Sequence, residues 1–102
     1  SLGRQIANEN EKLAMEELEI KINETWTRFN ESFSILETHK KSLELANNNY
    51  EIVNNRYLND LALITDMLDA SNSKLSAELQ MADSKINILM LYFNLCRLSG
   101  TL

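Results

Sequence analysis

The strongest constraint on the fold is an apolar residue that returns every seven positions through the first half of the chain. A second set, mostly small or weakly polar, follows three residues behind the first. This spacing is typical of a coiled-coil seam, and the chain contains no proline that would kink a helix. We therefore expect one long helix whose seam lets a neighbour approach closely. The seam positions are Met15, Ile22, Phe29, Leu36, Leu43, Tyr50 and Tyr57, followed by Leu18, Thr25, Ser32, His39, Ala46 and Val53.

The heptad pattern stops at Asn59-Asp60 and a new helical pattern starts a few residues later. Asn and Asp adopt left-handed and capping conformations more readily than most residues, so this pair can end one helix and start the next. The sequence therefore predicts an all-α fold, a long antiparallel αα-hairpin with coiled-coil packing. We expect helices over about residues 5–57 and 62–98, joined by a tip within about 57–62.

The second half carries two apolar stripes on different faces of one expected helix. The first repeats the heptad logic and is expected to form the seam, whereas a simple two-helix hairpin would expose the second to water. Two apolar faces fit either a curved wall of helices or a four-helix bundle made by dimerisation. The first stripe is Leu61, Leu68, Leu75, Ala82, Leu89 and Cys96 with Ile64, Leu79, Ile86 and Phe93, and the second is Leu63, Met67, Ala70, Ala77, Met81, Ile88, Tyr92 and Leu95.

Composition excludes several classes of function. The net charge of -5 argues against binding to a nucleic-acid backbone, which requires clustered Lys and Arg. One cysteine, Cys96, and one histidine, His39, give neither an internal disulfide nor a zinc site. Without a nucleophile beside a base, or a glycine-rich phosphate loop, we expect no enzyme activity and no cofactor. The longest apolar run, 88–93, is far shorter than the roughly 20 residues of a membrane-spanning helix.

The segment from Arg56 to Ala70 contains Arg-Tyr, a short turn and Asp-x-Leu-Asp-Ala. This order resembles the signature of TolC-like outer-membrane efflux proteins, in which such a segment joins two long helices. Ala77, Ala82 and the terminal 100–102 (Gly-Thr-Leu) also fall where that family places small residues and a closing Gly-x-Leu. The resemblance covers roughly residues 45–102. The family usually has glycine in place of Asp60, so the shape of the turn is expected to differ.

The resemblance implies that the chain is part of a larger channel protein of a Gram-negative bacterium. Such a protein is a homotrimer with a shared β-barrel in the outer membrane and an α-helical barrel in the periplasm, to which this hairpin would belong. It exports small molecules or proteins together with a periplasmic adaptor and an inner-membrane pump. The isolated fragment is expected to self-associate, because the second apolar stripes of its helices would be covered by neighbouring helices in the whole protein.

Two alternative functions are the helical hairpin of a periplasmic adaptor and a generic coiled-coil scaffold. Adaptor tips place Leu four residues after an Arg and Ser seven residues further on. Counted from Arg56, those positions hold Asp60 and Met67, so the adaptor pattern fails here.

The resemblance also assigns candidate site residues near the tip. Asp66 and Asp69 match acidic residues that line the pore entrance, where three-fold symmetry would make each a ring of carboxylates. Both also fall where carboxylates complement the helix dipole, so capping is the simpler role. Tyr57 matches a tyrosine that latches the closed tip, although it also completes the heptad seam. Ala62 stands where such proteins can carry a latch arginine, and Arg56 is the available substitute.

Overall fold

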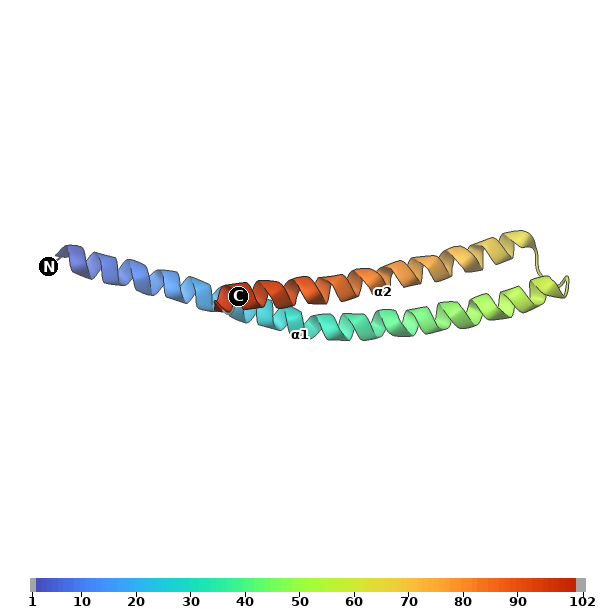
Figure 1. Cartoon of the computed structure of the whole chain (residues 1–102), viewed down its shortest axis with the longest axis horizontal. Coiled ribbons are helices and arrows are strands. Elements are labelled where there is room, and N and C mark those ends of the chain that lie inside the picture. Colours follow the sequence, from blue (N-terminus) through green and yellow to red (C-terminus); the bar gives the residue numbers. More distant parts are fainter. Residues whose placement is uncertain (1, 101–102) are drawn as a thin grey trace.

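The computed structural model describes residues 2–100, which form two long helices folded back on each other (Figure 1). Helix α1 spans Leu2–Leu58 and helix α2 spans Ile64–Ser99. The hairpin measures 87 × 19 × 18 Å, and its radius of gyration of 23.8 Å is far above the roughly 13 Å of a compact domain this long. The expected all-α antiparallel hairpin is confirmed, and no strand occurs within 2–100.

Helix α1 is longer than α2, and its N-terminal part projects beyond the end of α2 (Figure 1). Residues 2–21 are all exposed, and Ile22 is the first partly buried residue of the chain. Met15 and Leu18, which were expected to begin the seam, therefore have no facing helix and expose 67% and 43% of their surface. The heptad continues through this segment, but the seam itself starts at Ile22, one heptad after Met15.

From Ile22 to Val53 the seam of α1 is the one that the heptad pattern predicts, since its positions are the buried or half-buried ones. The small members are the most deeply buried, with Ser32 at 1% exposure and Thr25 at 9%. The Ser32 hydroxyl donates to the carbonyl of Phe29 and thereby satisfies its own buried oxygen. Large members such as Phe29 are only half-buried, because two helices cannot enclose a side chain that reaches past the line of contact.

In α2 the expected assignment of the two stripes is wrong. The second stripe, expected to face water, packs on α1, and the first is exposed on the outer edge of the hairpin. Two members of the second stripe do not pack on α1: Leu63 and Tyr92 are 70% and 49% exposed. The α2 seam is Met67, Ala70, Lys74, Ala77, Met81, Ser84, Ile88, Leu91 and Leu95.

Layers of large and small side chains alternate along the seam. In one large layer the Lys74 ammonium Nζ lies 4.6 Å from the centroid of the Tyr50 ring, a cation–π contact between the helices. In the next layer along the seam Ala46 of α1 lies level with Ala77 of α2, and Ala77 is 7% exposed. Methyl groups in such a layer let the two backbones approach, and the larger neighbours then pack above and below them.

We predict that Ala77→Leu destabilises the hairpin, because a larger side chain in a small layer forces the helices apart. Overpacking of this kind costs about 1–3 kcal/mol. Ser76→Leu adds a larger side chain at the adjacent exposed position and is the matched control. Urea unfolding of both variants, followed by far-ultraviolet circular dichroism at one protein concentration, measures the difference. Equal stability of the two would contradict the assignment of Ala77 to the seam.

Candidate functional site at the hairpin tip

Helix α1 ends in a left-handed cap centred on Asp60, whose φ is +58°. The N–H of Leu61 donates to the carbonyl of Arg56 at 2.7 Å, and the N–H of Asp60 donates to the carbonyl of Tyr57 at 3.1 Å. These two bonds satisfy carbonyls at the end of the helix that would otherwise lack partners. Asp60 thus occupies the position that favours glycine, and the left-handed turn expected from Asn59-Asp60 is present.

Helix α2 starts with a cap supplied by Asp66. The backbone N–H of Leu63 donates to Asp66 Oδ2 at 3.1 Å, and the N–H groups of Asp66 and Met67 donate to the Leu63 carbonyl at 3.0 and 3.2 Å. Leu63 has no side-chain acceptor, so the Asp66 carboxylate provides the polar part of this cap. The capping role that was one of two alternatives for Asp66 is therefore present in the structure.

Asp69 lies one turn beyond Asp66 and makes no side-chain hydrogen bond within the described range 2–100. Together with Arg56 and Ala62 the two carboxylates line a shallow hollow at the tip, closed on the α1 side by Asn49. No Arg56 nitrogen comes within 4.0 Å of a carboxylate oxygen in the part of the chain that is described. The hollow therefore brings together four of the positions that the resemblance singles out.

Tyr57, the candidate latch, stands apart from this hollow. Its side chain is 38% exposed and does not line the hollow. Since Val53 is the last α1 seam residue that is partly buried, Tyr57 does not complete the seam either. The ring therefore lies on the last turn of α1, partly open to solvent.

The tip hollow belongs to a polar side that runs along the whole hairpin. At the opposite end a second hollow is lined by residues of both helices, among them Arg28 and Asn94, that stand at the same heptad positions as those at the tip. Between 21 and 94 Ile35 interrupts this polar row, and the exposed Leu45 and Ile52 stand beside it on α1. The polar side comprises Lys21, Arg28, Ser42, Asn49 and Arg56 of α1 and Asp66, Ser73, Gln80, Asn87 and Asn94 of α2.

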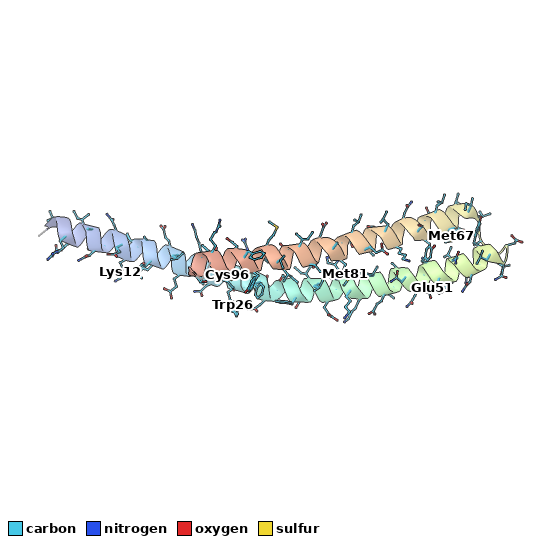
Figure 2. All side chains as sticks on the ribbon, in the orientation of Figure 1. Lys12, Trp26, Glu51, Met67, Met81 and Cys96 are labelled. Carbon is cyan, nitrogen blue, oxygen red and sulfur yellow. The ribbon has the colours of Figure 1, made fainter. Side chains whose placement is uncertain are left out.

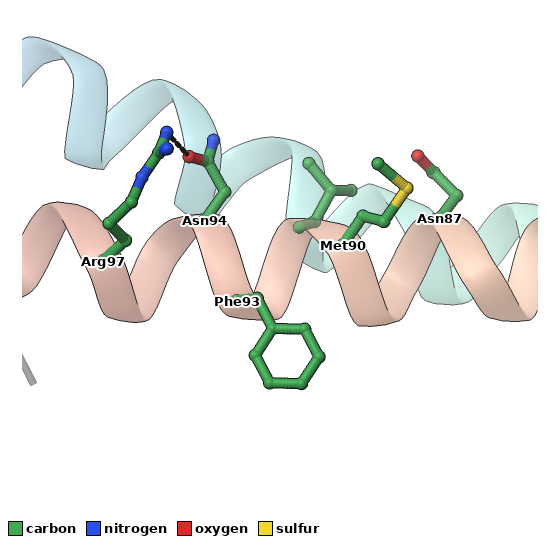
Figure 3. Close-up of a pocket in the computed structure, with 6 residues that line it drawn as sticks. Asn87, Met90, Phe93, Asn94 and Arg97 are labelled. Carbon is green, nitrogen blue, oxygen red and sulfur yellow. Dashed lines mark hydrogen bonds between the residues drawn. The ribbon is translucent and has the colours of Figure 1, made fainter. Parts of the chain in front are cut away.

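Near the C-terminal end of α2, Arg97 Nη2 donates to Asn94 Oδ1 at 2.8 Å, one turn apart on the same helix (Figure 3). Met90 and Asn87 continue this row, whereas Phe93 points away from it (Figure 3). These residues line an open hollow, and its one charged side chain, Arg97, is exposed. Sequence analysis did not single out this pair, and only its spacing of three residues could have indicated it.

An aromatic cluster joins the two helices at the same end of the hairpin. Phe29 packs edge-on against Phe33 with ring centroids 5.0 Å apart, and reaches Trp26 at 6.0 Å and Tyr92 of α2 at 6.2 Å. Tyr92 in turn contacts Phe93 at 5.8 Å. Aromatic pairs with ring centroids this far apart stabilise a structure beyond the apolar area that they bury. The cluster therefore stabilises the contact between the helices at the end of the seam away from the tip. In Figure 2 this end of the seam lies beside the labelled residues Trp26 and Cys96.

The described residues offer little for chemistry. Within 2–100 no group of three His, Cys, Asp or Glu side chains could hold a metal ion. The Cys96 thiol is half-buried and hydrogen-bonds with Tyr92, which raises the pKa of the Tyr92 hydroxyl above its usual value. His39 lies in the seam. Neither helix, as far as it is described, has a stretch long and apolar enough to cross a membrane.

Comparisons with known proteins returned no match: no family model fits the chain, and neither a curated protein nor a solved structure resembles it significantly. The closing Gly-x-Leu of the resemblance is described only at Gly100, which has a left-handed φ of +76° and ends α2. Thr101 and Leu102 lie outside the described residues. The candidate site is therefore defined by the geometry of the tip and the residues in it.

We predict that Asp66→Ala destabilises the hairpin more than Asp69→Ala. Both changes remove one carboxylate near the start of α2, but only Asp66 accepts a cap hydrogen bond. Loss of a cap costs about 0.5–2 kcal/mol. Urea unfolding of the two variants gives the difference directly. If the two losses were equal, a general charge effect would explain both and the Asp66 cap would contribute nothing.

We further predict that Asp60→Gly is neutral or stabilising, whereas Asp60→Ala is destabilising. A left-handed residue with a Cβ costs roughly 1–2 kcal/mol relative to glycine, and Asp offsets part of this by local hydrogen bonding. Thermal unfolding should rank the proteins Gly, Asp, Ala in decreasing stability. An Ala variant as stable as the Gly variant would show that residue 60 does not hold a left-handed conformation.

Proposed function

We propose that the chain is a segment of the periplasmic duct of a TolC-like outer-membrane efflux or secretion channel. The proposal starts from the tip, where Arg56, Asp66 and Asp69 line one hollow beside the turn. Asp66 and Asp69 are the positions at which the resemblance places entrance carboxylates, and Arg56 is the available substitute for a latch arginine. The long two-helix hairpin is the element from which such a duct is built.

The observation that carries the proposal is the exposed stripe on α2. Leu75, Leu79 and Ile86 expose 53%, 58% and 56% of their surface on the edge of the hairpin that faces away from α1. A helix that is apolar on two opposite faces is stable in water only when a further helix covers the second face. A wall of laterally packed helices provides that cover.

The polar side supports the same reading. A wall element that borders an aqueous duct needs a side that water can wet, and the amides, hydroxyls and charges from Lys21 to Asn94 provide a polar row along the seam, with exposed apolar residues only at Ile35, Leu45 and Ile52 on its α1 part. In a trimer, Asp66 and Asp69 would each occur three times around the axis. Rings of carboxylates favour cations at a pore entrance. By the same resemblance an adaptor and an inner-membrane pump would dock at this end.

An adaptor hairpin and a generic scaffold are the alternatives. The adaptor tip pattern does not fit the residues after Arg56, and a scaffold does not require carboxylates and an arginine in one hollow. Both alternatives predict that the chain functions without forming a pore, which separates them from the channel by one electrical measurement.

That measurement is planar-bilayer recording of the full-length parent trimer with the change Asp66→Asn together with Asp69→Asn. Asn caps helices well, so we expect the variant to keep its fold and trimeric state. Removal of the carboxylate rings should reduce cation selectivity and weaken block by multivalent cations. Glu44→Gln with Glu78→Gln removes the same number of charges away from the tip and is the control.

The proposal predicts a changed selectivity in the tip variant alone. If selectivity stayed the same while stability fell, Asp66 and Asp69 would be capping residues and the entrance assignment would be wrong. If the parent protein formed no conducting trimer at all, the channel itself would be excluded.

A further inference from the structure

The two outer edges of the hairpin differ sharply in chemistry. On α1, the heptad positions opposite the seam are polar and exposed from Thr27 to Asn55, whereas the projecting segment holds Ile6, Leu13 and Ile20 at these positions. On α2, the corresponding positions become apolar from Leu79 onward, and their neighbours widen this into a stripe. The polar positions of the α1 edge are Thr27, Ser34, Lys41, Asn48 and Asn55.

The exposed area is large for a chain of this length. The hairpin exposes 8046 Å², whereas a compact monomer of the same mass exposes about 5,900 Å². This excess of about 2,000 Å² includes the projecting segment 2–21 as well as the stripe, and obligate homodimers bury about 1,000 Å² or more on each copy. A second copy therefore supplies enough area to cover the stripe, provided that its own covering surface is apolar.

Within the two-helix part of the hairpin, the surface that matches the α2 edge best is the α2 edge itself. We infer that two copies pair through their α2 edges and run antiparallel. A two-fold axis relates them and crosses the stripe at the level midway between residues 80 and 81. This axis places Leu79 opposite Ala82 of the second copy, Leu75 opposite its Ile86, and Leu68 opposite its Phe93. Each layer then joins residues of the exposed stripe.

The charges beside the stripe select this direction of pairing. Glu78 and Lys85 are both exposed, on the same side of the stripe and one heptad apart. About the two-fold axis, Glu78 of each copy faces Lys85 of the other, so the contact forms twice. In a parallel pair, a residue that flanks the stripe on one helix faces the residue five positions later in the sequence of the other helix. Glu78 would then face Asp83. Antiparallel pairing attracts where parallel pairing repels.

This inference does not rest on the proposed duct. In a duct all hairpins point the same way, and the α2 edge would be covered by a helix from another part of the parent polypeptide. The two ideas can therefore fail separately: the dimer by the experiments below on the 102-residue chain, the channel by recordings from the full-length protein.

The first experiment is disulfide trapping with Thr65→Cys, which keeps the native Cys96. Residues 65 and 96 lie on one helix, about 46 Å apart at 1.5 Å per residue, so they cannot join within a molecule. The antiparallel register places them opposite each other in the dimer. We expect mild oxidation to link Thr65→Cys into a covalent dimer through residues 65 and 96, as peptide mapping would show. Ser73→Cys, on the polar side, is the control and should not link.

The second experiment is a charge swap measured by sedimentation equilibrium. Glu78→Lys places like charges opposite each other twice and should weaken the dimer roughly tenfold. Adding Lys85→Glu restores both opposite-charge contacts and should return the dissociation constant to that of the original protein. Leu79→Glu, beside the two-fold axis, should abolish the dimer while circular dichroism stays helical, because Leu79 makes no seam contact.

Three results would overturn the inference. The unaltered chain could remain monomeric at micromolar concentration. Oxidation of the unaltered chain could join Cys96 to Cys96, which requires parallel helices. The double charge swap could fail to restore the dimer that Glu78→Lys weakens, which would exclude the proposed register.

Discussion

The small side chains of the seam determine how the rest of the hairpin is built. Ser32, Ala70 and Ala77 expose 1%, 4% and 7% of their surface, whereas the large residues between them stay half-exposed. Two helices that touch through methyl and hydroxyl groups come close together and bury little apolar area in each layer. The seam alone therefore contributes modest stability, and the apolar stripe of α2 stays exposed because it faces away from the one line of contact that two helices share.

This close contact also explains which parts of the fold could be predicted from the sequence. The α1 seam was recognisable because its alternate positions, such as Phe29 and Leu36, are large and regularly spaced. The break at Asn59-Asp60 was recognisable because Asp tolerates the left-handed conformation that residue 60 adopts. In α2 the seam contains Lys74, Ala77 and Ser84, so a search for the most apolar stripe selects the outer edge instead.

At the tip, the residue types alone did not determine the roles of Asp66, Asp69 and Tyr57, and the geometry was needed to separate them. The identities of Asp66 and Asp69 fit a cap and a pore entrance equally well. Only the hydrogen bond from the Leu63 N–H separates the two carboxylates, because it engages Asp66 and leaves Asp69 without such a bond within residues 2–100. A residue that caps a helix holds its carboxylate in one position, so capping and entrance roles are compatible for Asp66. Tyr57 differs, because it lies in the last turn of α1 and its side chain does not line the hollow.

Lys74 is the one residue among the Lys, Arg, Asp and Glu side chains of 2–100 that is not exposed, and it lies between two alanine layers. Its ammonium group needs an acceptor or an aromatic face when water is partly removed, and the Tyr50 ring provides that face. If α2 slid by one heptad along α1, Leu43 or Tyr57 would replace Tyr50, and the large and small layers would still match. The layers thus permit several registers, while the Lys74–Tyr50 contact and the short tip together favour one.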